Sequence, residues 1–255
     1  MDLPRISTGI TGLDALLNGG FIKGRSYLLT GDTGTGKTVA CLQFLMHGLA
    51  AGEKAVYVTA DERPAEILAS ATSFAWDLQT YIQNKSLIIL DAASGTATEK
   101  GVDAPKMVAD LGNYTKGLGA TLLIIDPITP LLFSANPAVP RQLHARSLIQ
   151  LIQSQLATTN LFTSHEPKTG AQDAATGIEQ FLASGVLLLK SRESGGRCER
   201  VIHVKKMRHT AVEPAEYPFV MVKNQGITLV DRAALGAVPP RHAESPLFRS
   251  FEPSN

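Results

Sequence analysis

Short runs of apolar residues recur along most of the chain with two different spacings. Compact runs of apolar and β-branched residues occupy 25–30, 55–60, 86–90, 120–126, 160–164 and 184–190. Between the early runs, apolar residues recur with the spacing of a helix, at 38–51, 64–74, 104–117 and 139–157. Strands that alternate with helices form a mostly parallel sheet covered on both faces, so this order predicts an α/β, doubly wound fold.

The pattern changes after residue 184. Short apolar segments follow without an intervening helix, at 185–191, 199–206, 217–222 and 226–230. Such segments predict antiparallel hairpins added to the edge of the sheet. Beyond Val230 the periodicity ends and three prolines fall within 239–246. We therefore predict one domain over residues 1–231 and a Pro-rich tail over 232–255 that is disordered or docks on a neighbouring molecule.

Composition narrows the classes of function. Of the 255 residues, 44% are hydrophobic and 18% are charged, which suits one domain with a large core. The net charge of +1 gives no overall basic field that would favour nucleic acid or an anionic membrane. Cys41 and Cys198 are far apart and fit neither a metal motif nor a disulfide framework. We find no signal-peptide pattern and no apolar run near the ~20 residues of a membrane span, so we expect a cytoplasmic protein without membrane partners.

Residues 31–38 read GDTGTGKT, a complete G-x-x-x-x-G-K-T phosphate-binding loop with a predicted strand before it and a predicted helix after it. In such loops, backbone N–H groups and the helix N-terminus surround phosphate oxygens. Lys37 is expected to reach the β- and γ-phosphates as a catalytic residue, and the Thr38 hydroxyl is expected to coordinate Mg²⁺. The residues expected to bind ATP and Mg²⁺ here are Gly31, Asp32, Thr33, Gly34, Thr35, Gly36, Lys37, Thr38 and Val39.

Carboxylates at the ends of two predicted strands are candidates for the rest of a hydrolytic site. Asp126 ends the run 120–126 and is expected to hold Mg²⁺ through water, although an Asp there also caps the following turn. Asp61 and Glu62 follow the run 55–60, where a carboxylate can orient and partly deprotonate the water that attacks the γ-phosphate. The same pair precedes Pro64 and suits the start of a helix, and the two roles are compatible.

Two basic residues near the end of the segment 199–206 are further candidates. Strand alternation puts Lys206 and Arg208 on one face, and Lys205 and Met207 on the other. Two positive groups on one face can serve a γ-phosphate, either that of their own chain or that of a neighbour. A charged edge strand that resists aggregation explains the same residues equally well.

The run 160–164 is followed by a histidine that offers one more candidate. His165, or the adjacent Ser164, could sense the γ-phosphate and couple hydrolysis to movement. A single histidine at the end of a strand is more often structural, so this remains the less favoured interpretation.

Taken together, these segments resemble the KaiC/RecA-like ATPases, and in particular a single KaiC-type domain. The resemblance runs from about Arg5 to Val230. The segments that carry it are 7–20, ending in Gly-Gly, the phosphate-binding loop, 123–129, 177–184, 204–210 and 216–219. The Lys-x-Arg at 206–208, followed by Glu-Tyr-Pro-Phe at 216–219, points most narrowly to KaiC-type proteins.

This resemblance implies a P-loop ATPase that converts ATP to ADP and phosphate in a homo-hexameric ring, with nucleotide at the subunit boundaries, and that acts on a protein partner. Lys37, Thr38 and Asp126 match the part of the site within one subunit, and Asp61-Glu62 match the paired catalytic acids of the family. Lys206 and Arg208 match the pair that the neighbouring subunit offers to the γ-phosphate. The implied nucleotide contacts of that subunit extend over Lys206, Met207, Arg208 and Thr210.

The chain also departs from the family pattern. The first catalytic acid is Asp61 where the family has a glutamate, so Glu62 is the preferred base. The residues after Arg208 are His-Thr-Ala-Val, where the family usually has Gly-Thr-Ser-His. The sequence has one such domain and no clear Ser-Thr phosphorylation pair in its late region, which argues against autokinase activity and a clock role.

Two other classes of function fit a RecA-like core. A recombination ATPase of the RecA/RadA type binds single-stranded DNA and needs basic or aromatic loops. The corresponding loop here, 166–175, holds one lysine and two acidic residues, which makes a nucleic-acid partner less favoured. A binding module that uses ATP mainly to stabilise an oligomer is the third class, and the sequence does not exclude it.

Overall fold

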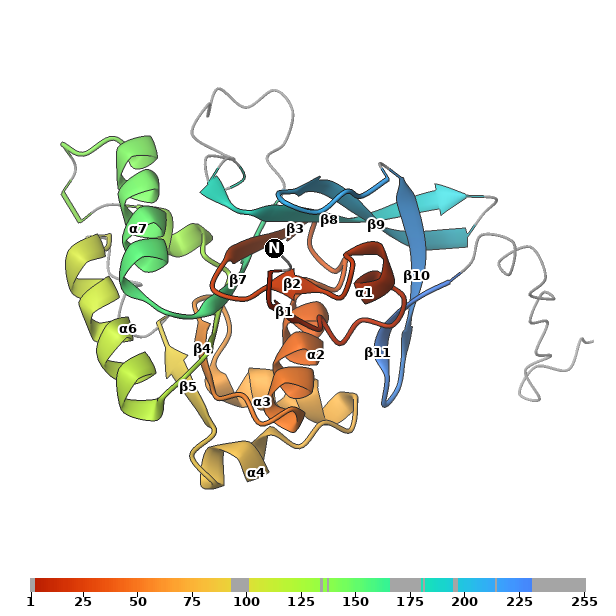
Figure 1. The fold of residues 1–255 in the computed structure, drawn as a ribbon, viewed down its shortest axis with the longest axis horizontal. Helices are drawn as coiled ribbons and strands as arrows, with labels where there is room; N and C mark the ends of the chain where they lie inside the picture. The colour runs from red at the N-terminus through yellow and green to blue at the C-terminus, as the bar shows by residue number, and fades with distance from the viewer. Residues whose placement is uncertain are drawn as a thin grey trace, which may run out of the picture.

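The computed structural model describes residues 3–92, 101–133, 135–136, 138–165, 180, 182–194, 197–213 and 215–230 (Figure 1). The strands are β1 (Arg5–Ile6), β2 (Phe21–Ile22), β3 (Ser26–Gly31), β4 (Ala55–Thr59), β5 (Leu87–Asp91), β6 (Leu122–Asp126), β7 (Thr159–Ser164), β8 (Gly185–Ser194), β9 (Arg197–Met207), β10 (Glu216–Val222) and β11 (Gly226–Leu229). The helices are α1 (Leu13–Leu16), α2 (Lys37–Ala50), α3 (Pro64–Ser73), α4 (Leu78–Gln83), α6 (Ala104–Leu118), the 3-10 turn η1 (Thr129–Leu132) and α7 (Arg141–Gln155).

One large sheet organises the molecule, with the strand order β11-β10-β9-β8-β3-β7-β6-β4-β5. The strands from β8 to β5 in this order are all parallel, whereas β9, β10 and β11 pair antiparallel at the other edge. The α/β, doubly wound architecture with late antiparallel edge strands is therefore confirmed, and each predicted strand in the chain is found within a few residues of its expected place. The tail 232–255 lies outside the described residues.

Two hydrophobic layers cover the sheet because the buried strands send alternate side chains to opposite faces. In β4, Tyr57 packs into the layer under α2 and α3, whereas Val56 and Val58 pack into the layer under α6 and α7. Figure 1 shows α6 and α7 side by side, well separated from the group formed by α2, α3 and α4. The carboxyl ends of the central strands therefore emerge between two packed helical layers.

Several short elements were not expected from the sequence. The β1–β2 ribbon, α1 and α4 each have six residues or fewer, too short for a periodic pattern. A signal for α4 was present, because Asp77 accepts hydrogen bonds from the backbone N–H and the hydroxyl of Thr80 and so caps the helix start. The predicted helix over 139–157 begins at Arg141 and ends at Gln155.

A β-bulge in β9 corrects the predicted strand faces. Val186 pairs with Lys206 but the next residue of β8, Leu187, pairs with Val204, so Lys205 is an extra residue. The bulge places Lys206 on the face opposite Val204, whereas Met207 packs against the layer under α2. The prediction that Lys205 shares a face with Met207 was therefore wrong, because Lys205 borders the same hollow as Lys206 and Arg208.

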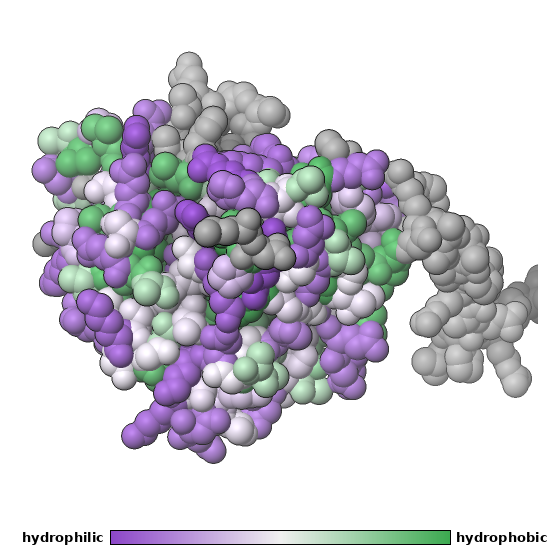
Figure 2. All heavy atoms as spheres, in the orientation of Figure 1, coloured by the Kyte–Doolittle hydropathy of each residue, from purple (hydrophilic) through white to green (hydrophobic). Residues whose placement is uncertain are grey.

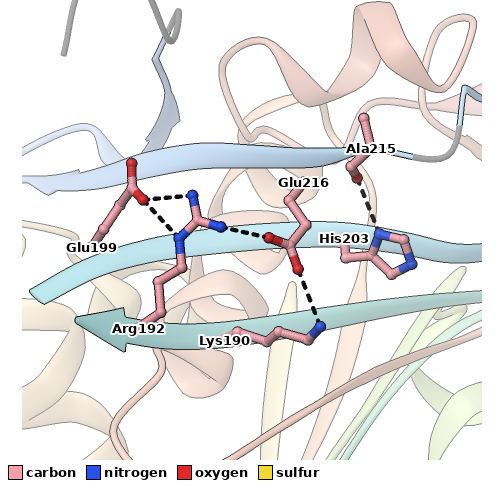
Figure 3. Close-up of polar contacts among 6 residues, drawn as sticks. All are labelled: Lys190, Arg192, Glu199, His203, Ala215 and Glu216. Atoms are coloured by element: carbon pink, nitrogen blue, oxygen red, sulfur yellow. Dashed lines mark hydrogen bonds and ion pairs between the residues drawn. The ribbon is translucent and has the colours of Figure 1, made fainter. Parts of the chain in front are cut away.

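Charged side chains tie the antiparallel strands together on one face (Figure 3). Arg192 of β8 forms ion pairs with Glu199 of β9 and Glu216 of β10, at 2.6 and 2.8 Å, and Lys190 also contacts Glu216 at 3.1 Å. On the neighbouring strand, Nδ1 of His203 lies 3.1 Å from the Ala215 carbonyl oxygen. Each partly exposed pair stabilises little by itself, but the shared Arg192 fixes three strands to one another.

None of the described helices is long and apolar enough to cross a membrane. The face seen in Figure 2 is mostly hydrophilic, and its hydrophobic residues lie in separate groups.

Gln43 of α2 connects three distant segments through a buried amide. Its Nε2 donates hydrogen bonds to the carbonyl oxygens of Gly9 and Ile227, at 2.7 and 3.0 Å, and its Oε1 accepts from the Ile227 N–H at 2.6 Å. Only 4% of the Gln43 side chain is exposed, so these backbone groups have no ready access to water. Gln43 therefore holds the N-terminal segment and β11 against α2.

Replacing Gln43 with Leu should lower the free energy of unfolding by about 2–4 kcal/mol, because buried backbone groups lose their partners while volume is kept. The measurement is the Tm in a thermal melt, compared with Gln79→Leu on the exposed surface of α4. A loss no larger than that of Gln79→Leu would contradict the role assigned to the Gln43 amide.

Candidate functional site

The phosphate-binding loop joins the carboxyl end of β3 to the start of α2, as its sequence predicts. Two of its glycines are required, Gly31 by close packing and Gly36 by its backbone conformation. A Cβ on Gly31 would lie 2.2 Å from the carbonyl oxygen of Leu189 in β8, and one on Gly36 would lie 2.1 Å from Cε of Met221. Gly36 also has φ +105°, a left-handed conformation that other residues rarely adopt. Both glycines let strands β8 and β10 pack directly against the loop.

The loop forms the floor of a hollow of about 410 Å³. The residues that line it are Thr33, Gly34, Gly36, Lys37, Thr38, Val39, Asp61, Glu62, Asp126, Pro127, Thr163, His165 and Met221. The sheet thus brings together the loop, the candidate metal-side carboxylate and the candidate acidic pair from 30 to 90 residues apart in sequence. Thr35 lies beneath the hollow, where its hydroxyl donates to the Asp32 carbonyl oxygen at 2.8 Å and fixes the loop.

Lys37 lies across the loop. Its Nζ donates hydrogen bonds to the carbonyl oxygens of Gly31 and Asp32, each at 2.8 Å. Burial lowers the pKa of Lys37, and the negative charges of Asp126 and Asp32 oppose that shift. The lysine is therefore a positive group in a partly water-excluded place, which suits an anionic ligand.

Asp126 is buried at the end of β6 with a hydrogen-bond donor on each side. The Tyr57 hydroxyl donates to Oδ2 at 2.8 Å, and the Thr163 hydroxyl donates to Oδ1. Burial, followed by the charge of Asp126, raises the pKa of Tyr57 well above its usual value, so the phenol keeps its proton. With Thr38 across the hollow, the donor set consists of hard oxygens, which fit Mg²⁺.

Sequence reasoning missed Tyr57, Thr163 and Met221. A buried tyrosine needs a partner for its hydroxyl, so Tyr57 within the apolar run 55–60 was a usable signal. Met221 had none, because its place beside Gly36 depends on how β10 packs against the loop.

Asp61 and Glu62 follow β4 and reach the hollow from the side. The Thr59 hydroxyl donates to the Glu62 carbonyl oxygen at 2.6 Å and fixes this turn. Burial raises the pKa of both carboxyl groups, and Asp126 adds to the effect in each case. For Glu62, Glu66 and Asp61 raise the pKa further. A carboxylate with a raised pKa is a better proton acceptor, as a general base requires.

A helix starts after this segment as expected, but its capping contacts come from Arg63 and Glu66 rather than from Asp61 or Glu62. Helix α3 begins at Pro64, and the Arg63 N–H donates to the Glu66 carboxylate at 2.8 Å. His165 also lines the hollow, and its charge lowers the pKa of Asp61. Ser164 does not line it, because its side chain is buried and points to the opposite face of β7 from Thr163.

Lys206 and Arg208 lie near the end of the sheet at which the parallel strands begin, away from the phosphate loop. Met207 pairs with Gly185, which pairs with Tyr27 at the start of β3, whereas the phosphate loop begins at Gly31. The four intervening steps correspond to about 13 Å along the strand. Neither basic residue lines the hollow over the phosphate loop; both border a second one, of about 470 Å³, with Lys205, Gln180 and Val186.

Local contacts fix this basic segment. Lys206 Nζ donates to the carbonyl oxygens of Gln180 and Ala183, at 3.0 and 2.7 Å, and burial and the nearby Arg208 lower its pKa. The Thr210 hydroxyl accepts a hydrogen bond from Arg5 at 3.0 Å, and the same guanidinium donates to the Gly20 carbonyl oxygen at 2.9 Å. Arg5 therefore attaches the turn after β9 to the N-terminal segment.

Known proteins resemble this chain in sequence and in fold. The family model described as "ATPase: KaiC" matches residues 6–234. The chain belongs to the KaiC ATPase family. A circadian clock oscillator protein KaiC from Picosynechococcus sp. is 32% identical over 237 residues, covering 91% of this chain and 45% of the relative. KaiC from Prochlorococcus marinus is 33% identical over 244 residues, covering 93% and 47%.

A solved structure agrees with these sequence relatives. A KaiC-like protein from the hyperthermophilic archaeon Pyrococcus horikoshii superimposes with a TM-score of 0.76 at 30% identity, covering 90% of this chain and all of that one. The chain spans about half the length of the KaiC proteins that it matches. The RecA-like fold and membership in a family of ATP-binding P-loop ATPases are therefore established for this chain.

The raised pKa of Glu62 predicts how pH affects stability. The folded state binds the Glu62 proton more tightly than the unfolded state does, so this group destabilises the protein increasingly as pH rises from its unfolded pKa to its folded pKa. Glu62→Gln should therefore raise the Tm at pH 7 by about 1–2 °C, and the gain should shrink toward pH 4.

Glu53 provides a control of opposite sign. Hydrogen bonds from Lys23 and Thr121 lower the pKa of Glu53, so its contribution to stability is present above its unfolded pKa and disappears as pH falls through its folded pKa. Glu53→Gln should lower the Tm at pH 7 and lose this effect in acid. Thermal melts of the two variants between pH 4 and 8 would count against the assignment if both shifts had the same sign.

Proposed function

We propose that this chain binds Mg²⁺-ATP in the hollow above the phosphate loop and hydrolyses it to ADP and phosphate within a homo-hexameric ring. One observation carries the proposal. The sheet gathers Lys37, Asp126 and Glu62 in one hollow, while Lys206 and Arg208 border a separate hollow toward the opposite end of the parallel strands. The first set suits the binding of a nucleotide by its own chain, and the second suits a neighbouring subunit.

Within one subunit, the loop backbone and Lys37 bind the β- and γ-phosphates, and the start of α2 directs N–H groups to the same oxygens. Thr38 holds Mg²⁺ directly, and Asp126 holds it through water. The bound ion supplies charge neutralisation on the β- and γ-phosphate oxygens. Met221 beside Gly36 closes one wall of the hollow with an apolar surface.

Glu62 acts as the general base in this proposal. Its carboxylate accepts the proton of the attacking water, and Asp61 is the alternative because it lines the same hollow. The partial burial that raises the pKa of Glu62 increases the basicity of its carboxylate. His165 borders the hollow beside Asp61, a position from which it can sense the γ-phosphate, whereas the buried Ser164 is less suited to this task.

A second subunit completes the site. Lys206 and Arg208 lie too far along the sheet to reach the nucleotide of their own chain, and we infer that they contact the γ-phosphate held by the neighbour. Interfaces of this head-to-tail kind close into rings or extend into filaments. Resemblance to the KaiC family favours the ring form, in which Met207 and Thr210 would add contacts to the neighbour's nucleotide. We further propose that the nucleotide state alters binding to a protein partner in the cytoplasm.

The competing functions have less support. The loop 166–175, on which a recombination function would depend, lies outside the described residues, and its acidic composition disfavours DNA. A module that uses ATP only to stabilise an oligomer would lack turnover, so the rate of phosphate release separates it from the leading proposal. We do not propose autokinase activity.

Active-site variants test the hydrolytic assignment. Lys37→Ala should abolish ATP turnover and weaken nucleotide binding, since the main positive group is lost. Glu62→Gln should slow phosphate release about a hundredfold or more and leave ATP binding intact, since it removes the base alone. Wild-type turnover in Glu62→Gln would transfer the role to Asp61.

Mixing two inactive variants tests the shared site. Glu62→Gln removes a group of the nucleotide's own chain, and Arg208→Ala removes a group of the neighbour. Co-assembled one to one, about a quarter of the interfaces would combine an intact Glu62 with an intact Arg208, so about a quarter of the wild-type ATPase rate should return.

The matched control mixes Lys37→Ala with Glu62→Gln. Both changes affect the same side of the interface, so this mixture should remain inactive.

Light scattering with and without a non-hydrolysable ATP analogue should give a mass near that of a hexamer of the 27.2 kDa chain. A monomer in both conditions, with no recovery in either mixture, would exclude the shared site.

A further inference from the structure

The candidate metal-side carboxylate is held by strands on both sides. Asp126 lies on β6, between β4 and β7 in the sheet. From β4 the Tyr57 hydroxyl donates to Oδ2 at 2.8 Å, and from β7 the Thr163 hydroxyl donates to Oδ1. Each carboxylate oxygen therefore has one donor, and the two donors approach from opposite sides of the strand.

The strand register explains why these two residues reach Asp126. Thr163 follows Phe162, which pairs with Ile125, so Thr163 lies directly beside Asp126. Tyr57 pairs with Ile124, two residues earlier, and a tyrosine is long enough to bring its hydroxyl forward to the carboxylate. A phenylalanine at this position would pack equally well and could not donate.

Tyr57, Asp126 and Thr163 form a clamp that is largely buried, with Asp126 at the wall of the hollow. Tyr57 is fully buried, Thr163 is 0% exposed and Asp126 is 7% exposed. The other titratable groups with a resolved interaction with Asp126 are Lys37 and Cys41 on α2, and Asp61 and Glu62 after β4. A buried carboxylate with a donor on each oxygen has a fixed plane, and one lone pair of each oxygen stays available.

We propose that Tyr57 and Thr163 are positioning residues that hold Asp126 in the orientation needed to bind the hydrated Mg²⁺ of the nucleotide. This inference rests on the proposed function and extends it to two residues that act through Asp126. Groups that orient a ligand from behind commonly change metal affinity by about tenfold or more when removed. The effect should therefore appear in the affinity for Mg²⁺ before it appears in the affinity for nucleotide.

The test uses the full-length protein and a fluorescent ADP analogue. Its affinity is measured first with EDTA and then as a function of Mg²⁺ concentration, so the metal contribution is read directly without turnover. Tyr57→Phe should leave the affinity in EDTA unchanged. It should raise the Mg²⁺ concentration for half-maximal effect about 3- to 10-fold, because the carboxylate loses one of its two restraints.

Tyr27 offers a matched control. It is 1% exposed, packs in the same layer as Tyr57, and its hydroxyl accepts a hydrogen bond from the Ile22 N–H at 2.7 Å, away from Asp126. Tyr27→Phe also removes a buried, hydrogen-bonded hydroxyl and should lower the Tm by a similar amount. It should leave the Mg²⁺ dependence at the wild-type value, which separates positioning from general stability.

A second pair of variants tests the other side of the clamp. Thr163→Val keeps the shape and removes the donor, whereas Thr163→Ser keeps the donor. The valine variant should need more Mg²⁺, and the serine variant should recover most of the wild-type dependence.

The outcomes separate the two levels of the proposal. Wild-type protein that binds no nucleotide, or binds it without any effect of Mg²⁺, would overturn both the proposed function and this inference. Wild-type protein with a clear Mg²⁺ effect, and a Tyr57→Phe curve equal to that of Tyr27→Phe, would overturn the positioning role alone.

Discussion

The parallel pairing of β3, β7, β6 and β4 is the constraint on which the rest of the molecule depends. Parallel strands in register end at the same edge, so whatever follows them is brought together regardless of separation in sequence. Thr59 pairs with Asp126 and Thr30 pairs with Ser164, so the chain segments that follow these four strands leave the sheet at nearly one level. The phosphate loop, the buried carboxylate and the acidic turn meet for this reason.

Concentrating charges at that edge has an energetic cost that the apolar layers offset. The site disfavours the ionised forms of Asp61, Glu62 and Lys37 through partial burial, and the carboxylates also repel one another. Such local destabilisation is typical of sites in which charged groups are held ready for a ligand. The two hydrophobic layers on either face of the sheet, each built around fully buried Leu and Ile side chains, provide the compensating stability.

The sequence predicted those features of the structure that depend on residues close together along the chain. The alternation of strands and helices and the phosphate loop are local signals, and both the fold and the position of that loop agree with them. The partnership of Tyr57 with Asp126 depends on strand order, and the place of Met221 depends on sheet packing, so neither is encoded in spacing. The β1–β2 ribbon and α4 are too short to produce a period. The bulge at Lys205 interrupts the alternation of faces. It could not be predicted because the sequence of one strand does not show which residue is unpaired in the sheet.

Because of that bulge, the number of residues in β9 determines which basic side chains lie on the surface. After Lys205, each side chain of β9 lies on the face of the sheet opposite to the one that it would have in a strand without the bulge. Related chains that differ by one residue in this strand would therefore exchange core and surface positions, even with the Lys-x-Arg spelling unchanged. Relatives should accordingly be aligned by the pairing of Val186 with its partner on β9 rather than by the motif, since the pairing determines which side chains a neighbouring molecule meets.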